Sequence, residues 1–308
     1  DAIANNIIQI TASSLVKPTT NSLEIIPKNK QLLEEIKNIG IKGFSPTSLT
    51  NYIRNPIDFY KKNILKINDT NEVEESVAAN TFGTIVHDSL EELYQPFIGQ
   101  YLNKELLESL STKIGKVVKS NFIKTYADGD ITRGKNLIAY NVIVRYIENF
   151  IALEIKELEK HQIKIIALEQ SMEVLIEVPT IPYPVKIKGK LDRIDEVDGV
   201  TRIVDYKTGK VEIKNVKIIA WEELITTYDK SKAFQLLCYA LLFNAKAPID
   251  TIKAGILSFK NLNSGILNFN YLKSEEINQS TLLEFKSVLI ALIQEIFNPE
   301  IPFEEKEV

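Results

Sequence analysis

The sequence predicts an α/β protein in which helices pack around a mixed β-sheet. Helical periodicity dominates up to about residue 160, and from about residue 163 the pattern changes to short segments rich in Ile and Val. Helices are followed by three or more strands, another helix and another strand, an order that favours an α/β sandwich. The chain has 308 residues with 44% hydrophobic and 25% charged residues, which is typical of a soluble globular protein.

Residues 1–43 are predicted to be an N-terminal extension or linker, because their hydrophobic pattern is weak. Within this range, 31–39 is expected to form a short helix that ends at Gly40. The chain begins with Asp1 and shows neither an initiator methionine nor a secretory leader. We therefore expect a processed chain or an excised piece of a longer protein.

Residues 44–160 are expected to be mainly helical. Ser45 is a predicted N-cap with Pro46 at the first helical position, and this helix should stop near Asn55-Pro56. The helices expected after it begin at Thr81 and then cover roughly 103–126 and 134–160.

Residues 161–308 are expected to supply the sheet. The predicted strands are 163–168, 172–178, 185–195, 200–206, 251–259 and 265–271. Asp198-Gly199 is a predicted hairpin turn. Helices are expected at about 232–243 and 274–297.

Charge and cysteine content limit the kinds of site that the chain can contain. The net charge is −4 and the pI about 5.5, so bulk charge gives no support to nucleic-acid binding. Local lysine clusters at 61–66 and 113–124 are either solvated helix faces or phosphate contacts. Cys238 is the only cysteine, which excludes an internal disulfide and a four-cysteine metal site. The apolar runs are too short to span a bilayer, so we expect no membrane contact. A buried, inert Cys238 thiol fits a reducing compartment, and we expect a cytoplasmic protein.

Two acidic residues and a lysine stand at the ends of adjacent predicted strands. Asp192 follows Gly189-Lys190-Leu191, and Asp205 is followed two residues later by Lys207. Residues two apart on a strand leave the same face, so Asp205 and Lys207 should point together. Carboxylates hold hard cations such as Mg²⁺. Alternatively, these residues form ordinary salt bridges with one another.

This pattern resembles the PD-(D/E)XK nuclease superfamily, and within it the RecB-like branch. Further segments match that branch in the same order along the chain. They are Ser45–Leu49 with Tyr52 and Asn55–Tyr60, Phe82–His87, Gln235–Tyr239 and Asn298–Phe303. The resemblance implies a restriction-endonuclease-like αβββαβ core with a mixed central sheet. It assigns 44–308 to a nuclease domain, with a helical part at about 44–160 and the catalytic sheet core at about 161–308.

The resemblance also implies a role for each motif residue. His87, Asp192, Asp205 and the backbone carbonyl of Tyr206 would hold Mg²⁺ or Mn²⁺, with Asp205 able to bridge two ions. Lys207 would orient the attacking water and stabilise the transition state. A structural role remains the alternative for His87.

Three further polar positions keep two interpretations each. Gln235 and Tyr239 share a helical face that either borders the active centre or is a polar stripe on an apolar helix. Glu169 either supports the metal waters or is a plain charge at a strand end. Asp195 is predicted to pair with an arginine or a turn amide, and His161 to lie at the surface.

The implied function is a metal-dependent deoxyribonuclease, expected to act as an exonuclease on single-stranded DNA ends in repair or recombination. The pattern is similar to the C-terminal nuclease domains of AddB-type subunits, so we expect a helicase partner or a larger parent chain. Many such domains hold an iron–sulfur cluster, but Asn55-Pro56 stands where the first Cys-Pro would be, and we expect no cluster. The alternative is a non-catalytic DNA-binding or scaffolding module.

Overall fold

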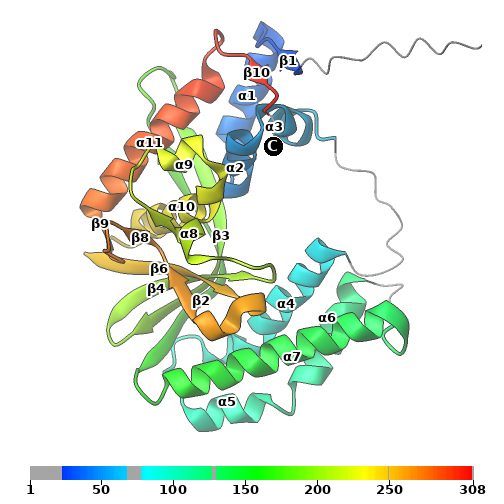
Figure 1. Cartoon of the computed structure of the whole chain (residues 1–308). Helices are drawn as coiled ribbons and strands as arrows, with labels where there is room; N and C mark the ends of the chain where they lie inside the picture. The colour runs from blue at the N-terminus through cyan, green and yellow to red at the C-terminus, as the bar shows by residue number, and fades with distance from the viewer. Residues whose placement is uncertain (1–22, 68–77, 127–129, 249, 307–308) are drawn as a thin grey trace, which may run out of the picture.

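A computed structural model describes residues 23–67, 78–126, 130–248 and 250–306 (Figure 1). The first 22 residues of the predicted extension therefore lie outside the described chain. The rest of it contains β1 (Ile25–Ile26) and helix α1 (Lys30–Lys42). Strand β1 pairs with β10 (Phe303–Glu304), and α1 contacts both α11 and β3. This segment packs on the rest of the fold, and a domain boundary at residue 43 stays a prediction.

The centre of the protein is a mixed sheet, which confirms the predicted fold class. Its strands are β2 (Ile163–Ile176), β3 (Val185–Val197), β4 (Val200–Lys207), β6 (Thr251–Ser258) and β7 (Ile266–Asn268), in the order 2-3-4-6-7. Only the β4–β6 pair is parallel; the other pairs on this path are antiparallel. Short strand β9 (Ile277–Asn278) also pairs with β6, while β5 (Lys217–Ile218) and β8 (Asn270–Tyr271) form a separate parallel pair.

Helices cover both faces of the sheet (Figure 1). One group contains α2 (Pro46–Arg54), α3 (Pro56–Phe59), α8 (Ile213–Val216), α9 (Glu223–Thr226), α10 (Ser231–Lys246) and α11 (Gln279–Phe297). The other contains α4 (Ala79–Tyr94), α5 (Lys104–Leu110), α6 (Ile114–Thr125) and α7 (Gly134–Glu157), and we call it the helical insertion. Single turns at η1 (Tyr60–Ile64), η2 (Gln95–Phe97), η3 (Tyr228–Lys230) and η4 (Phe259–Ser264) connect these elements.

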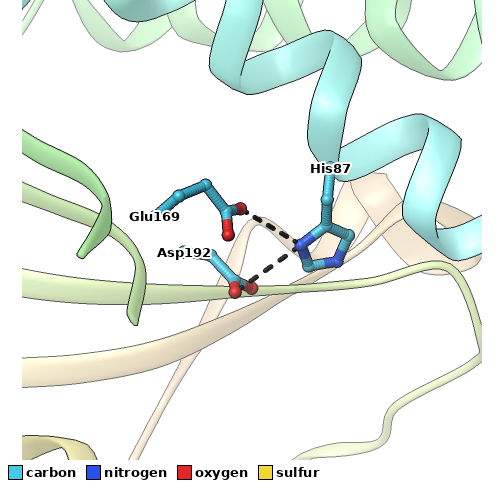
Figure 2. Close-up of side chains that lie close together, drawn as sticks. All are labelled: His87, Glu169 and Asp192. Atoms are coloured by element: carbon cyan, nitrogen blue, oxygen red, sulfur yellow. Dashed lines mark ion pairs between the residues drawn. The ribbon is translucent and has the colours of Figure 1, made fainter. Parts of the chain in front are cut away.

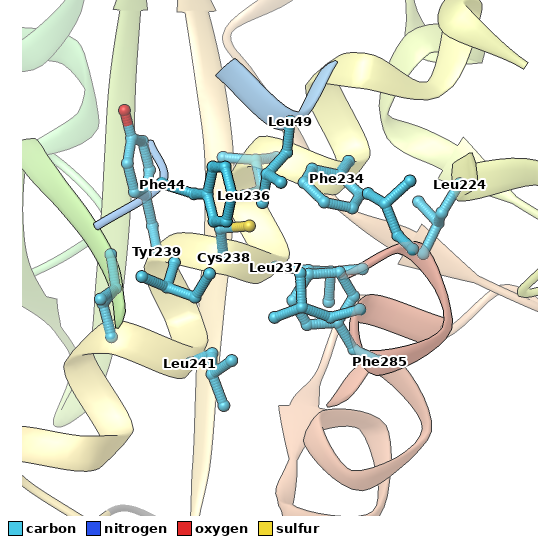
Figure 3. Packing of buried hydrophobic residues seen from close by; sticks show 14 of the residues in the cluster. Phe44, Leu49, Leu224, Phe234, Leu236, Leu237, Cys238, Tyr239, Leu241 and Phe285 are labelled. Carbon is cyan, nitrogen blue, oxygen red and sulfur yellow. The ribbon is translucent and has the colours of Figure 1, made fainter. Parts of the chain in front are cut away.

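Each face of the sheet has its own hydrophobic core. Helix α10 is buried along most of its length between the sheet, α2 and α11; Phe234 packs edge-on against Phe285, with ring centroids 5.4 Å apart (Figure 3). On the other face, the helical insertion packs on a cluster that includes Val204 and Tyr206 of β4 and Leu257 of β6. Strand β4 therefore lies between two packed layers.

Several predicted elements differ from the structure. The strand expected over 265–271 is divided into β7 and β8, which belong to different sheets, and the helix expected over 274–297 begins only at Gln279, after β9. The helix expected over 103–126 is divided into α5 and α6 by a turn at 111–113, where Ser111 and Thr112 bond to backbone carbonyls of α5. The strands expected at 163–168 and 172–178 are one continuous strand, β2, because its pairing with β3 continues through the polar residues between them. Among the described residues, no helix has the length and apolar character needed to cross a bilayer.

Candidate metal centre

Asp192 and Asp205 lie side by side on neighbouring strands. The β3–β4 pairing ends with Arg193 and Val204, and Asp192 and Asp205 are the residues that follow directly beyond this last pair, close enough for the charge of Asp192 to raise the pKa of Asp205. Both are buried, with 8% and 1% of their surface exposed. The Oδ2 atom of Asp192 accepts a hydrogen bond of 2.7 Å from the backbone N–H of Tyr206. Two carboxylates are therefore held together in a site that excludes most water.

Lys207 provides a positive charge for this pair. Its Nζ lies 2.5 Å from Oδ2 of Asp205. Burial raises the pKa of Asp205, and the nearby lysine opposes that rise. Burial alone would lower the pKa of Lys207, but the charges of Asp205 and Asp192 raise it overall. The lysine therefore stays protonated and partly neutralises the two acids.

His87 reaches the same centre from α4 (Figure 2). Its Nδ1 lies 3.4 Å from Oε1 of Glu169 and 3.5 Å from Oδ1 of Asp192. Its Nε2 lies 3.1 Å from the backbone carbonyl of Tyr206. Burial works against a charge on the ring, but the two carboxylates raise the pKa of His87 to about 10. The imidazolium thus supplies positive charge at the point where a metal ion would supply it.

Glu169 joins the cluster through an unusual backbone. Its φ is +46° within β2, a conformation that non-glycine residues rarely adopt and that is often found at functional sites. The carboxylate also accepts from Lys190 Nζ at 2.7 Å. Glu169 was not among the predicted ligands, although its place opposite Asp192 follows from the β2–β3 register on either side of it. The polar stretch Glu169–Ser171 in an Ile-rich strand was the available sequence signal.

The donor set fits a divalent cation. Single ligand atoms of His87, Glu169 and Asp192 all lie within 4.8 Å of one another, so one ion could contact all three. Two carboxylate oxygens and one imidazole nitrogen suit Mg²⁺ or Mn²⁺ chemistry. Asp205 adjoins this set, and the predicted ligand carbonyl of Tyr206 is bonded to the ring of His87.

Gln235 and Tyr239 form a bonded pair beside the centre. Gln235 Nε2 donates to the Tyr239 hydroxyl at 2.7 Å, and both side chains come from α10. Burial, followed by the charges of Asp205 and Asp192, raises the pKa of Tyr239. Gly189 permits this approach, since a Cβ there would lie 3.1 Å from the Tyr239 ring.

Asp195 belongs to a different group of charges. It accepts from Arg193 Nε at 2.8 Å and from Arg202 Nη2 at 2.8 Å, which confirms the predicted arginine pairing. Arg193 also pairs with Glu154 of α7 at 2.6 Å. Four buried or nearly buried charges therefore neutralise one another three residues along the strand from Asp192. His161 is 41% exposed, as predicted, and pairs with Asp198.

A cleft of about 660 Å³ opens onto the centre. One wall is the N-terminal half of α4, where Gly83 and Thr84 precede His87. Glu169, Lys190, Lys207 and Thr208 of the sheet and of the residues after β4 also line the cleft, as does Thr47 of α2. A substrate entering it would meet His87 and Lys207 together.

Comparison with known proteins identifies similar sequences. The sequence pattern described as the PD-(D/E)XK nuclease superfamily matches residues 43–307. An uncharacterized protein of Rickettsia typhi is 25% identical over 289 residues, covering 90% of this chain and 30% of that protein. One of Rickettsia conorii is 28% identical over 209 residues, covering 63% of this chain and 23% of that protein. The chain thus spans less than a third of the length of these relatives. The crystal structure of SSO0001 aligns over 83% of this chain and 95% of its own, at 13% identity and a TM-score of 0.23.

Proposed function

The chain belongs to the PD-(D/E)XK nuclease superfamily, and from this premise we propose that it is a metal-dependent deoxyribonuclease. The observation that supports the proposal most is the meeting of His87, Glu169 and Asp192 at one point, with the Asp205–Lys207 pair beside it. These groups come from a helix and three strands, so their convergence is a property of the fold. They are the donors that phosphodiester hydrolysis needs.

The proposed ligands are His87 Nδ1 and the carboxylates of Glu169 and Asp192, with Asp205 able to contact a second ion. A bound Mg²⁺ or Mn²⁺ would polarise the phosphate and lower the pKa of a water molecule. The imidazolium proton of His87 must leave when Nδ1 becomes a ligand. Its Nε2–H would keep donating to the Tyr206 carbonyl, which fixes the tautomer and the ring plane.

Lys207 and the Gln235–Tyr239 pair would act on the substrate side. Lys207 is held at the centre by Asp205, and its ammonium group would orient the attacking water and stabilise negative charge on the phosphate. Tyr239 is held in place by its hydrogen bond from Gln235, and it would restrict the movement of the substrate beside Asp192 and Asp205. These roles follow from the charge of each side chain and its place in the site.

We further propose that the domain is RecB-like and acts as an exonuclease on single-stranded DNA ends. The support is the series of motifs at Ser45, His87, Gln235 and Asn298 in the order of that branch. The relatives extend far beyond the matched region, which supports a place within a larger protein. A helicase partner is proposed from the resemblance to AddB-type subunits alone. DNA repair or recombination is the proposed setting.

The test is cleavage of linear DNA labelled at one end, with Mn²⁺, by the wild-type protein and by Lys207→Ala. Wild-type cleavage that the variant loses supports the mechanism, whereas equal cleavage by both proteins contradicts it. Mononucleotide products indicate an exonuclease and internal fragments an endonuclease. Calorimetric titration with Mn²⁺ completes the test: DNA binding without metal binding or cleavage would identify a non-catalytic module instead.

A further inference from the structure

A row of three lysines leads along β3 to the metal centre. Lys186, Lys188 and Lys190 occupy alternate positions of the strand, and Asp192 is the next residue in the same alternation. Alternate residues leave a strand on the same face, roughly 6.6 Å apart for a rise of about 3.3 Å per residue. The residues between them, Val185 to Leu191, include core positions of the opposite face. The row is therefore a line of three cations on one face of β3, and Asp192, a proposed ligand, follows it in the strand.

Contacts at both ends place the three side chains together. A Cβ built on Gly43 would lie 3.0 Å from Cδ of Lys188 and 3.1 Å from Cδ of Lys186, so both stems pass the same point of the chain. Gly43 has φ +107°, which suits glycine and leaves that space open. At the other end, Lys190 reaches Glu169 and lines the cleft. The row thus runs from Gly43 into the cleft.

The row carries charge that is available to a ligand. Lys190 has 54% of its side chain exposed, and Lys188 is exposed and forms no ion pair with a described residue. Lys186 has 25% of its side chain exposed and donates to both carboxylate oxygens of Glu173, at 2.9 and 3.0 Å. Because Glu173 is 62% exposed, this surface pair contributes little stability, and a phosphate can replace the carboxylate. On β2, the partners of the row are Ser171, Glu173 and Leu175, so β2 places no second line of cations beside it.

We propose that this lysine row binds the phosphates of one DNA strand and guides that strand to the metal centre. This inference rests on the proposed nuclease function and adds the path of its substrate. Lysines bind phosphates as point charges without reading sequence, so the path would accept any base order. A single line of cations matches one backbone, whereas a duplex would present two. The charge of the row is local, which reconciles DNA binding with the net charge of −4.

The experiment compares Lys186→Ala/Lys188→Ala with a matched control, Lys116→Ala/Lys119→Ala on α6. Both double variants remove two exposed or part-exposed lysines and the same net charge. Binding of a labelled single-stranded oligonucleotide is measured in Ca²⁺ at several salt concentrations. We expect the row variant to lower the slope of log K against log salt by about 1.4, at about 0.7 for each phosphate contact on a single strand. The control should keep the wild-type slope.

Cleavage kinetics in Mn²⁺ supply the second measurement. We expect the row variant to raise KM for long single strands and to keep kcat, because neither lysine touches the metal centre. Unfolding curves check that the variant is folded, and Lys186→Arg/Lys188→Arg should restore binding. An unchanged salt slope, equal losses in the two double variants, or equal weakening on duplex DNA would overturn the inference. A wild-type protein that binds DNA through the row but does not cleave it would contradict the proposed function and leave the path in place.

Discussion

Asp192 and Asp195 are three residues apart on β3, yet their surroundings differ. Asp195 is fully buried and meets two arginines, whose charges are permanent because guanidinium groups do not lose their protons in proteins. Asp192 meets a protonated histidine and lies beside the buried carboxylate of Asp205. The charges around Asp195 cancel without any further ion. Around Asp192, the positive charges come from a histidine that can lose its proton and a lysine that can move. A buried carboxylate without a permanent partner is therefore the better candidate for metal binding.

Of the changes considered, removing an acid from the metal centre should have the largest effect, and the effect should be on kcat. Asp192→Asn and Asp205→Asn are each expected to lower kcat by a factor of about 10²–10³ or more, as does the loss of a preorganised electrostatic contact in other enzymes. End-labelled DNA in Mn²⁺ provides the measurement. Asp198→Asn, at the exposed hairpin turn, is the control and should keep full activity. Full activity in Asp192→Asn would remove this residue from the ligand set.

Breaking the arginine group should instead affect folding. Arg193→Met leaves Glu154 and Asp195 buried without this partner, and loss of one member of a buried ion pair costs about 3–5 kcal/mol of unfolding free energy. Urea denaturation measures the change. Adding Glu154→Leu should recover part of the loss, because an apolar pair has no charge to desolvate. A stable single variant would show that solvent reaches this group.

Metal binding should stabilise only a protein whose ligand set is intact. At a free Mn²⁺ concentration 100-fold above Kd, the folded state gains about 2.7 kcal/mol. Thermal unfolding with and without Mn²⁺ should show this gain in the wild type and a smaller one in Glu169→Gln. Glu173→Gln, on the same strand but outside the cluster, serves as the matched control. If Glu169→Gln gains as much as the wild type, the ion binds elsewhere.

The smallest effect is expected at Gly189, which belongs to neither charged group. A Cβ there would lie 2.9 Å from Leu242 and 3.1 Å from Tyr239, so Gly189→Ala should cost about 1–3 kcal/mol through overpacking. Because α10 would move away from β3, kcat should fall as well. Gly199→Ala, at a turn with no atom near the added Cβ, tests strain from its φ of +85° alone. If Gly189→Ala lowers the free energy of unfolding but leaves kcat unchanged, Tyr239 has no role in catalysis.

The common direction of Asp205 and Lys207 could be predicted from the sequence, because they are two residues apart on one strand. The grouping of Asp192 and His87 with them is implied by the resemblance to the nuclease superfamily. The mixed sheet also follows from the order of the elements. Glu169 could not be assigned in the same way: its direction depends on a positive φ and on the β2–β3 register, and hydrophobic periodicity reports neither. The lysine row is visible in the sequence, but its alignment with the cleft depends on Gly43 and Lys190 contacts that form only in the folded chain.

Tyr206 has a consequence for the integrity of the whole molecule. Its peptide groups bond to Asp192 on one side and to His87 on the other, although His87 stands more than a hundred residues earlier in the chain. A cation shared by His87, Glu169 and Asp192 would close these long loops of polypeptide in the way a cross-link does. The ion proposed for hydrolysis would then also link the helical insertion to the sheet and stabilise their packing.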